Sequence, residues 1–76
     1  MEVVESSGKF YSIDKDIYES RELYLQRIWF IINNFKYNNS ELLYLSKIWI
    51  NVKYFGMKYP SHIMQLLDKY NNQIDI

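Results

Sequence analysis

Few side chains in this sequence are of the types that carry out chemistry, and their spacing does not assemble a reactive group. His62 is the single histidine, and the hydroxyl of Ser61 directly precedes it. Adjacent residues on a helix do not face each other, so Ser61 and His62 are not placed to act as nucleophile and base. The acidic residues are scattered and suit helix caps and solvated faces. We therefore expect no catalytic residue, and a protein that is not an enzyme.

Metal and cofactor sites are not expected either. The chain has no cysteine, and one histidine cannot form a zinc site by itself. The glycines, Gly8 and Gly56, lie far apart and cannot form a glycine-rich loop that cradles phosphate. The sequence therefore predicts no cofactor and no metal.

The charge balance and the length restrict the partners and the size of the fold. Nine basic residues match nine acidic ones, so no basic field attracts phosphates and direct nucleic-acid binding is not expected. No apolar stretch is long enough to cross a bilayer, and the N-terminus does not resemble a signal peptide. We expect an intracellular, soluble protein of 76 residues with one domain and no membrane contact.

The first long segment with helical periodicity is predicted to run from Ile17 to Tyr37. Asp16 and Glu19 fit a capping box at its start. Projection at the helical period places the core-facing residues on one broad arc, which carries Ile17, Tyr24, Leu25, Ile28, Trp29, Ile31, Ile32 and Phe35. The opposite, solvated side carries Glu19, Glu22, Gln26 and Asn33.

A second helix is predicted from Ser40, as its N-cap, to Phe55, followed by a third that starts near Pro60. Gly56 suits the left-handed turn that ends the second helix. The core arc of the second helix carries Leu42, Tyr44, Leu45, Ile48, Trp49, Val52 and Phe55, and the third continues with Ile63, Met64, Leu66, Leu67 and Tyr70.

These patterns predict an all-α fold, a compact bundle of three main helices with or without a short N-terminal helical turn. No segment of useful length alternates with the period of a strand. Residues 1–15 are expected to form an N-terminal arm, residues 16–71 the helical domain and residues 72–76 a tail that frays.

Each of the first two helices carries a second, separate apolar stripe. The stripe on the first helix consists of Leu23, Phe30 and Tyr37, and that on the second of Leu43, Ile50 and Tyr54. One apolar arc is enough for a helix in a small bundle, so the additional stripes need something else to pack against. The candidates are the N-terminal arm with Phe10, Tyr11 and Ile13, a second copy of the chain, or a different protein.

The most specific pattern lies within residues 46–60 and consists of Trp49, Asn51, Tyr54, Phe55, Gly56, Tyr59 and Pro60. In order and spacing, these residues resemble the XTBD, the domain through which adaptors dock onto the nuclear 5'-to-3' exoribonuclease. The resemblance extends from about Tyr18 to Leu67 and also includes Glu19, Glu22, Arg27, Phe30, Ile31, Leu45 and Ser46. The chain departs from the family at Met57, where cysteine is usual, at Phe55, where leucine is frequent, and at Leu23 and Tyr24, where the family often has tryptophan.

The resemblance implies a non-catalytic, nuclear binding domain that stabilises or recruits an exoribonuclease of the Xrn type through apolar and aromatic contacts. The partner-binding residues that we predict are Tyr59, Tyr54, Met57, Phe55, Leu43, Ile50 and Pro60. For Tyr59 there is an equal alternative, in which its ring packs as a staple across the Gly56 turn. Asn51 is expected to tie the following loop to the helix, and Trp49 is expected in the core.

A different class of protein also fits these helices. A small helical scaffold or homodimer, including a viral protein that binds host factors, would carry the same apolar stripes. It would self-associate through Leu23, Phe30, Leu43 and Tyr54. If the chain is an XTBD, by contrast, we expect a monomer that captures the exoribonuclease.

Overall fold

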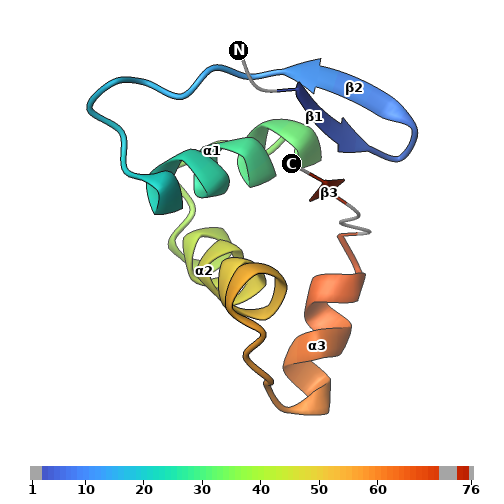
Figure 1. The fold of residues 1–76 in the computed structure, drawn as a ribbon. Helices are drawn as coiled ribbons and strands as arrows, with labels where there is room; N and C mark the ends of the chain where they lie inside the picture. The colour runs from blue at the N-terminus through green and yellow to red at the C-terminus, as the bar shows by residue number, and fades with distance from the viewer. Residues whose placement is uncertain (1–2, 71–73, 76) are drawn as a thin grey trace.

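A computed structural model describes residues 3–70 and 74–75 of the chain. In order, they form β1 (Val3–Ser6), β2 (Lys9–Ser12), α1 (Arg21–Asn33), α2 (Ser40–Phe55), α3 (Ser61–Asp68) and β3 (Ile74–Asp75). Helix α1 lies between the β1–β2 hairpin and α2, and α3 stands beside α2 with β3 above it (Figure 1). The fold is therefore mostly helical, and the prediction of an all-α fold is wrong in its exclusion of strands.

The sheet has the order β2-β1-β3, with antiparallel pairing throughout. Ser7 and Gly8 form the two-residue turn of the hairpin, and their φ angles of 52° and 78° are those that a tight hairpin turn requires. Strands of four residues are too short for their alternation of apolar and polar residues to be recognised. The residues of the turn were therefore the feature of the sequence that could have indicated a hairpin. The N-terminal arm thus forms strands rather than a helical turn.

Strand β3 joins the end of the chain to the hairpin. Ile74 is opposite Ser6 and Asp75 is opposite Glu5. Val4 and Ile74 are both fully buried, so the sheet contributes to the core. Of the predicted fraying tail, residues 72, 73 and 76 lie outside the described residues, whereas Ile74 and Asp75 are ordered as a strand.

Helix α1 is shorter at both ends than the sequence predicts. Its N-cap is Ser20, whose hydroxyl accepts from the Leu23 amide at 3.2 Å. The predicted capping box forms as a separate turn, in which the Glu19 carboxylate accepts from the Asp16 amide at 3.2 Å. At the other end, Asn34 adopts the left-handed conformation with φ 62° and ends the helix before Tyr37.

Both ends of α2 and the start of α3 lie within one residue of their predicted positions, whereas α3 ends at Asp68, two residues before the end of its predicted apolar pattern at Tyr70. Asn39, rather than Ser40, caps α2, since its side-chain oxygen accepts from the amides of Glu41 and Leu42. Gly56 ends α2 with φ 65°, as predicted. Pro60 is the N-cap of α3 and not a residue of its first turn. No helix of the described residues is both long and apolar enough to span a membrane.

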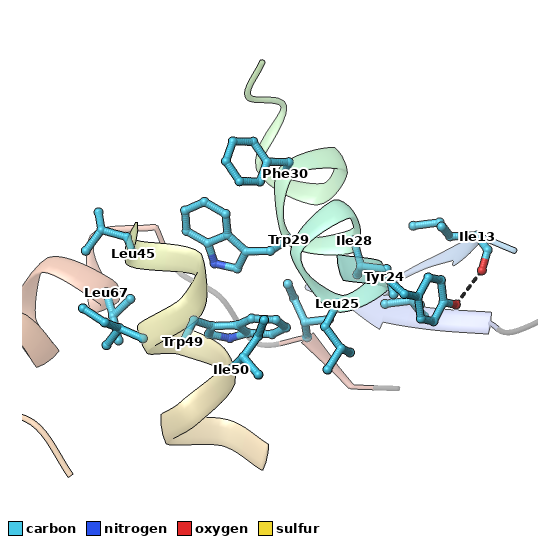
Figure 2. Packing of buried hydrophobic residues seen from close by; sticks show 13 residues of the cluster. Ile13, Tyr24, Leu25, Ile28, Trp29, Phe30, Leu45, Trp49, Ile50 and Leu67 are labelled. Carbon is cyan, nitrogen blue, oxygen red and sulfur yellow. Dashed lines mark hydrogen bonds between the residues drawn. The ribbon is translucent and has the colours of Figure 1, made fainter. Parts of the chain in front are cut away.

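The core surrounds α1 on most of its circumference (Figure 2). On the hairpin side, the Tyr24 hydroxyl donates to the carbonyl oxygen of Ile13 at 2.6 Å. On the other side, Trp29 packs edge-on against Phe30 and Tyr70, with centroid distances of 5.3 and 5.6 Å. Trp49 is buried, as predicted.

Several assignments to the core or to the solvated face are reversed in the structure. The side chains expected in the core arcs but exposed are Ile17, Ile31, Tyr44, Phe55 and Leu66. Gln26, expected in solvent, is instead buried. Because α1 has neighbours on two sides, its buried surface is wider than one arc and is shifted around the helix.

Candidate functional site

The second apolar stripes of α1 and α2 meet each other inside the chain. Leu23 and Ile50 line the same surface hollow, while Phe30 and Ile50 are both buried. Gln26 crosses the contact, and its Nε2 donates to the carbonyl oxygen of Leu43 at 3.3 Å and to the hydroxyl of Ser46 at 3.0 Å. This α1/α2 seam covers Ile50 and part of Leu43, whereas Leu23 remains 51% exposed.

Polar groups within the seam have hydrogen-bond partners. The Tyr37 hydroxyl donates to Gln26 Oε1 at 3.0 Å, and the Ser46 hydroxyl donates to the Leu43 carbonyl at 2.7 Å. Burial of the Tyr37 hydroxyl raises its pKa above the usual value. The ring of Tyr37 lies 4.7 Å from that of Phe30, so the residue covers one end of the seam although α1 ends before it.

The Gly56 turn is held by Asn51. The Asn51 side-chain Nδ2 donates to the hydroxyl oxygen of Tyr59 at 2.9 Å. The Asn51 carbonyl also accepts from the amides of Gly56 and Met57. Asn51 therefore ties the loop to α2 as expected, although its amide binds a side chain rather than the loop backbone. Tyr59 is consequently half-buried and fixed across the turn.

Two large apolar side chains project from this turn. Phe55 is 62% exposed and Met57 is 49% exposed, on either side of Gly56. Pro60 is exposed as well, and Tyr59 is half-buried. We call Phe55, Met57, Tyr59 and Pro60 the turn surface. An exposed apolar group of this kind, next to an aromatic ring held in place, is the chemistry of a protein-binding surface rather than of a reactive centre.

The remaining predicted contact residues lie behind the turn surface or in the seam. Tyr54 is half-buried, and its ring packs edge-on against Trp49 with centroids 5.7 Å apart. Leu43 is half-buried in the seam, and Ile50 is only 3% exposed. Four of the seven predicted residues thus lie between Phe55 and Pro60, and the other three lie within α2.

The side chains considered for catalysis do not come together with another reactive group. Ser61 and His62 are both exposed in the first turn of α3. Among residues 3–70 and 74–75, no three potential metal ligands lie close enough to hold a metal ion.

The sequence did not indicate the role of Arg27 in fixing the segment before α1. Its guanidinium makes two hydrogen bonds to the Glu19 carboxylate, both at 2.8 Å, and a third to the carbonyl oxygen of Asp14. The hydrogen bond from Arg27 holds the pKa of Glu19 below its usual value, and the same contact raises the pKa of Arg27. A pair separated by eight residues across a helix start leaves no periodic signal in the sequence.

Comparison with protein families identifies the chain. The model of the XRN-Two Binding Domain, XTBD, matches residues 13–76. The chain belongs to the XTBD family. The match confirms the resemblance inferred from the sequence, and it includes α1, α2, α3 and β3 but begins after the hairpin. Comparisons with curated proteins and with solved structures gave no match.

Within this XTBD, three of the residues that carried the resemblance hold the loop after α2 in place. Asn51, Gly56 and Tyr59 are joined by the hydrogen bonds described above. Their spacing follows from these bonds. The side-chain amide of Asn51, which lies in α2, has to reach across the turn at Gly56 to bind Tyr59 in the loop.

Proposed function

We propose that this chain is a non-catalytic adaptor module that binds a nuclear 5'-to-3' exoribonuclease of the Xrn type. The family is named for binding to XRN-Two. In this role the domain acts in RNA metabolism in the nucleus, where it stabilises the nuclease or brings it to another partner. Its balanced charge favours contact with the enzyme rather than with RNA.

The turn surface is the observation that carries this proposal. Phe55 and Met57 together offer apolar area that the chain itself leaves uncovered. Tyr59 is already fixed by Asn51, so its ring loses little conformational freedom when a partner covers it. Aromatic anchors of this kind, surrounded by apolar neighbours, dominate the binding energy of many interfaces.

The other predicted residues take part in different ways. Pro60 fixes the backbone between Tyr59 and α3 and contributes to the rim of the surface. Tyr54 and Leu43 contact a partner only through their exposed portions. Ile50 supports α2 from the seam, since almost none of its surface is accessible.

The proposal is tested by binding of the whole chain to a purified nuclear 5'-to-3' exoribonuclease of the Xrn type in calorimetry. We expect Tyr59→Ala to weaken binding by about 2 kcal/mol or more, roughly thirtyfold in Kd, because it removes the central ring. Tyr59→Phe keeps the ring and should lose much less. Circular dichroism of each variant checks that the helices remain.

The matched control is Tyr44→Ala. Tyr44 is also an exposed aromatic residue of α2, but it lies three helical turns before Phe55. It should leave the affinity nearly unchanged. The proposal is wrong if the unaltered chain does not bind the nuclease, or if Tyr44→Ala weakens binding as much as Tyr59→Ala while both variants stay helical.

A further inference from the structure

The segment between β2 and α1 presents a tyrosine that projects into solvent. Residues 13–20 contain neither helix nor strand, and their only regular feature is the turn from Asp16 to Glu19. At its tip, Tyr18 is 94% exposed and Ile17 is 83% exposed. Among the described residues, the Tyr18 hydroxyl has no hydrogen-bond partner, and its ring packs against no other aromatic ring.

The residues around Tyr18 are those that protein tyrosine kinases select. Asp16 and Glu19 place carboxylates on both sides of the acceptor, and Ile17 provides an apolar side chain directly before it. Kinases distinguish substrates by such charge and side-chain patterns next to the hydroxyl. We propose that Tyr18 is a phosphorylation site for a protein tyrosine kinase, with ATP as the phosphoryl donor.

The reaction is an ordinary phosphoryl transfer. The Tyr18 hydroxyl oxygen forms a bond to the γ-phosphorus of ATP, and the bond from that phosphorus to the β,γ-bridging oxygen breaks. ADP leaves, and the phenolic proton passes to the catalytic aspartate of the kinase. The product is phosphotyrosine, with no change of oxidation state.

Other tyrosines lack one or more of the features that Tyr18 combines. The hydroxyls of Tyr24, Tyr37 and Tyr59 donate or accept hydrogen bonds within the chain. Tyr44 is exposed but lies inside α2 between leucines. A kinase binds the acceptor segment in an extended form, which at Tyr44 would require α2 to unfold.

The segment around Tyr18 can extend without disturbing the core. Ile13 anchors its start through the hydrogen bond from Tyr24, and the residues after it are held to α1 by the partly exposed pair of Arg27 and Glu19 and by the bond from Arg27 to the Asp14 carbonyl. A few polar contacts of this kind open more readily than the packed core of a helix. Tyr18 is thus accessible while α1 stays folded.

Phosphorylation would act on the same contacts. Tyr18, Glu19, Lys15 and Arg27 line one surface hollow, and the phosphate adds about −1.5 to −2 charges there. It repels the Glu19 carboxylate and competes with it for the Arg27 guanidinium. The modification therefore loosens the Glu19–Arg27 pair and changes how residues 14–20 are held on α1.

The test uses the full chain, the catalytic domain of a non-receptor tyrosine kinase and magnesium-ATP. Peptide mass spectrometry locates the phosphate, and an acidic tyrosine peptide confirms that the kinase is active. We expect Tyr18 to be the main acceptor and Tyr18→Phe to reduce incorporation by roughly tenfold or more. Tyr44→Phe is the matched control and should leave incorporation unchanged.

The substituted side chain in Tyr18→Phe is exposed, so this variant should fold like the unaltered chain, which circular dichroism checks. A phosphate found chiefly on another tyrosine would overturn the proposal, as would its absence from Tyr18 in the presence of the active kinase. In the phosphorylated chain, the Arg27 Nε–H resonance should shift in NMR spectra. An unchanged resonance would refute the loosening of the Glu19–Arg27 pair.

Discussion

Asn51 connects the end of α2 to the loop through both its side chain and its backbone. The hydrogen bond from its side-chain amide to the Tyr59 hydroxyl can be removed by changing either residue. Asn51→Ala and Tyr59→Phe remove the same hydrogen bond from opposite sides. Each should lower the free energy of unfolding by about 1 kcal/mol, the usual net value of such a bond. The double variant should cost little more than the larger single change, as measured by urea denaturation. Simple addition of the two effects would show that the hydrogen bond contributes nothing.

Glu19 should make the stability depend on pH in the acid range. Arg27 lowers the pKa of Glu19 in the folded chain below its ordinary value of 4.5. The carboxylate therefore adds stability that is present above the ordinary value and is lost as the pH falls through the folded pKa. The difference in melting temperature between the unaltered chain and Glu19→Gln should be largest at neutral pH and should disappear in strong acid.

Arg27→Gln provides the control for this pH dependence, because it removes the cation that lowers the pKa. In an Arg27→Gln background, the further change Glu19→Gln should have nearly the same effect at every pH. A pH-dependent difference that persists in this background would assign the effect to a group other than the Glu19–Arg27 pair.

At the scale of elements, the end of α2 depends on a backbone conformation that most residues avoid. Gly56 has φ 65°, and a Cβ built on it would meet no atom within 4 Å. The cost of Gly56→Val therefore comes from the backbone and not from a clash, and we expect about 1–2 kcal/mol or more for a β-branched residue. Gly56→Asn should cost less, because asparagine tolerates this conformation. Equal denaturation midpoints for the two variants would contradict this explanation.

The sequence predicted elements better than their ends, for reasons visible at individual residues. Gly56 is the sole residue near the end of α2 that favours a left-handed turn, and the prediction there is confirmed. Near the start of α1, by contrast, both Asp16 and Ser20 can cap a helix, and the packing of the segment decides for Ser20. The hairpin escaped prediction because its strands are short, and β3 because its partner is distant in the sequence.

For the candidate site, too, the features that depend on local spacing could be predicted, and those that depend on the packing of the helices could not. The motif that ends in Tyr59 and Pro60 indicated the loop that Asn51 holds, since its spacing follows from local hydrogen bonds. That a partner binds at this loop stays a prediction. Exposure along α2 was harder to infer. Ile50 faces the seam and Phe55 faces solvent, and this depends on where α1 lies, which no local pattern contains.

On the scale of the whole molecule, the core includes the sheet as well as the helices. Ile74 is fully buried next to the hairpin. Ile74→Ala should therefore destabilise the whole chain by about 2–5 kcal/mol in urea denaturation, the range for a buried isoleucine. Leu66→Ala is the matched control, since Leu66 is 40% exposed on α3, and it should cost less than about 1 kcal/mol. Similar losses for both variants would mean that β3 adds little to the core.

The arrangement of the seam also bears on self-association. Phe30 is buried within the chain, and Leu43 is half-buried against α1. Two of the four residues that a homodimer would have used are thus largely occupied by contacts inside one chain. The large apolar side chains that the described residues leave exposed are spread over several elements, and those of the turn surface and of the segment around Tyr18 are among them.

The pairing of β1 with β3 has a consequence for the order of events during folding. Glu5 and Asp75 are neighbours in the sheet although most of the chain separates them. Bringing them together closes the longest loop in the molecule, which carries the largest entropic penalty. We therefore expect the helices and the hairpin, whose contacts are local, to form early, and β3 to be the last strand to dock and the first to detach.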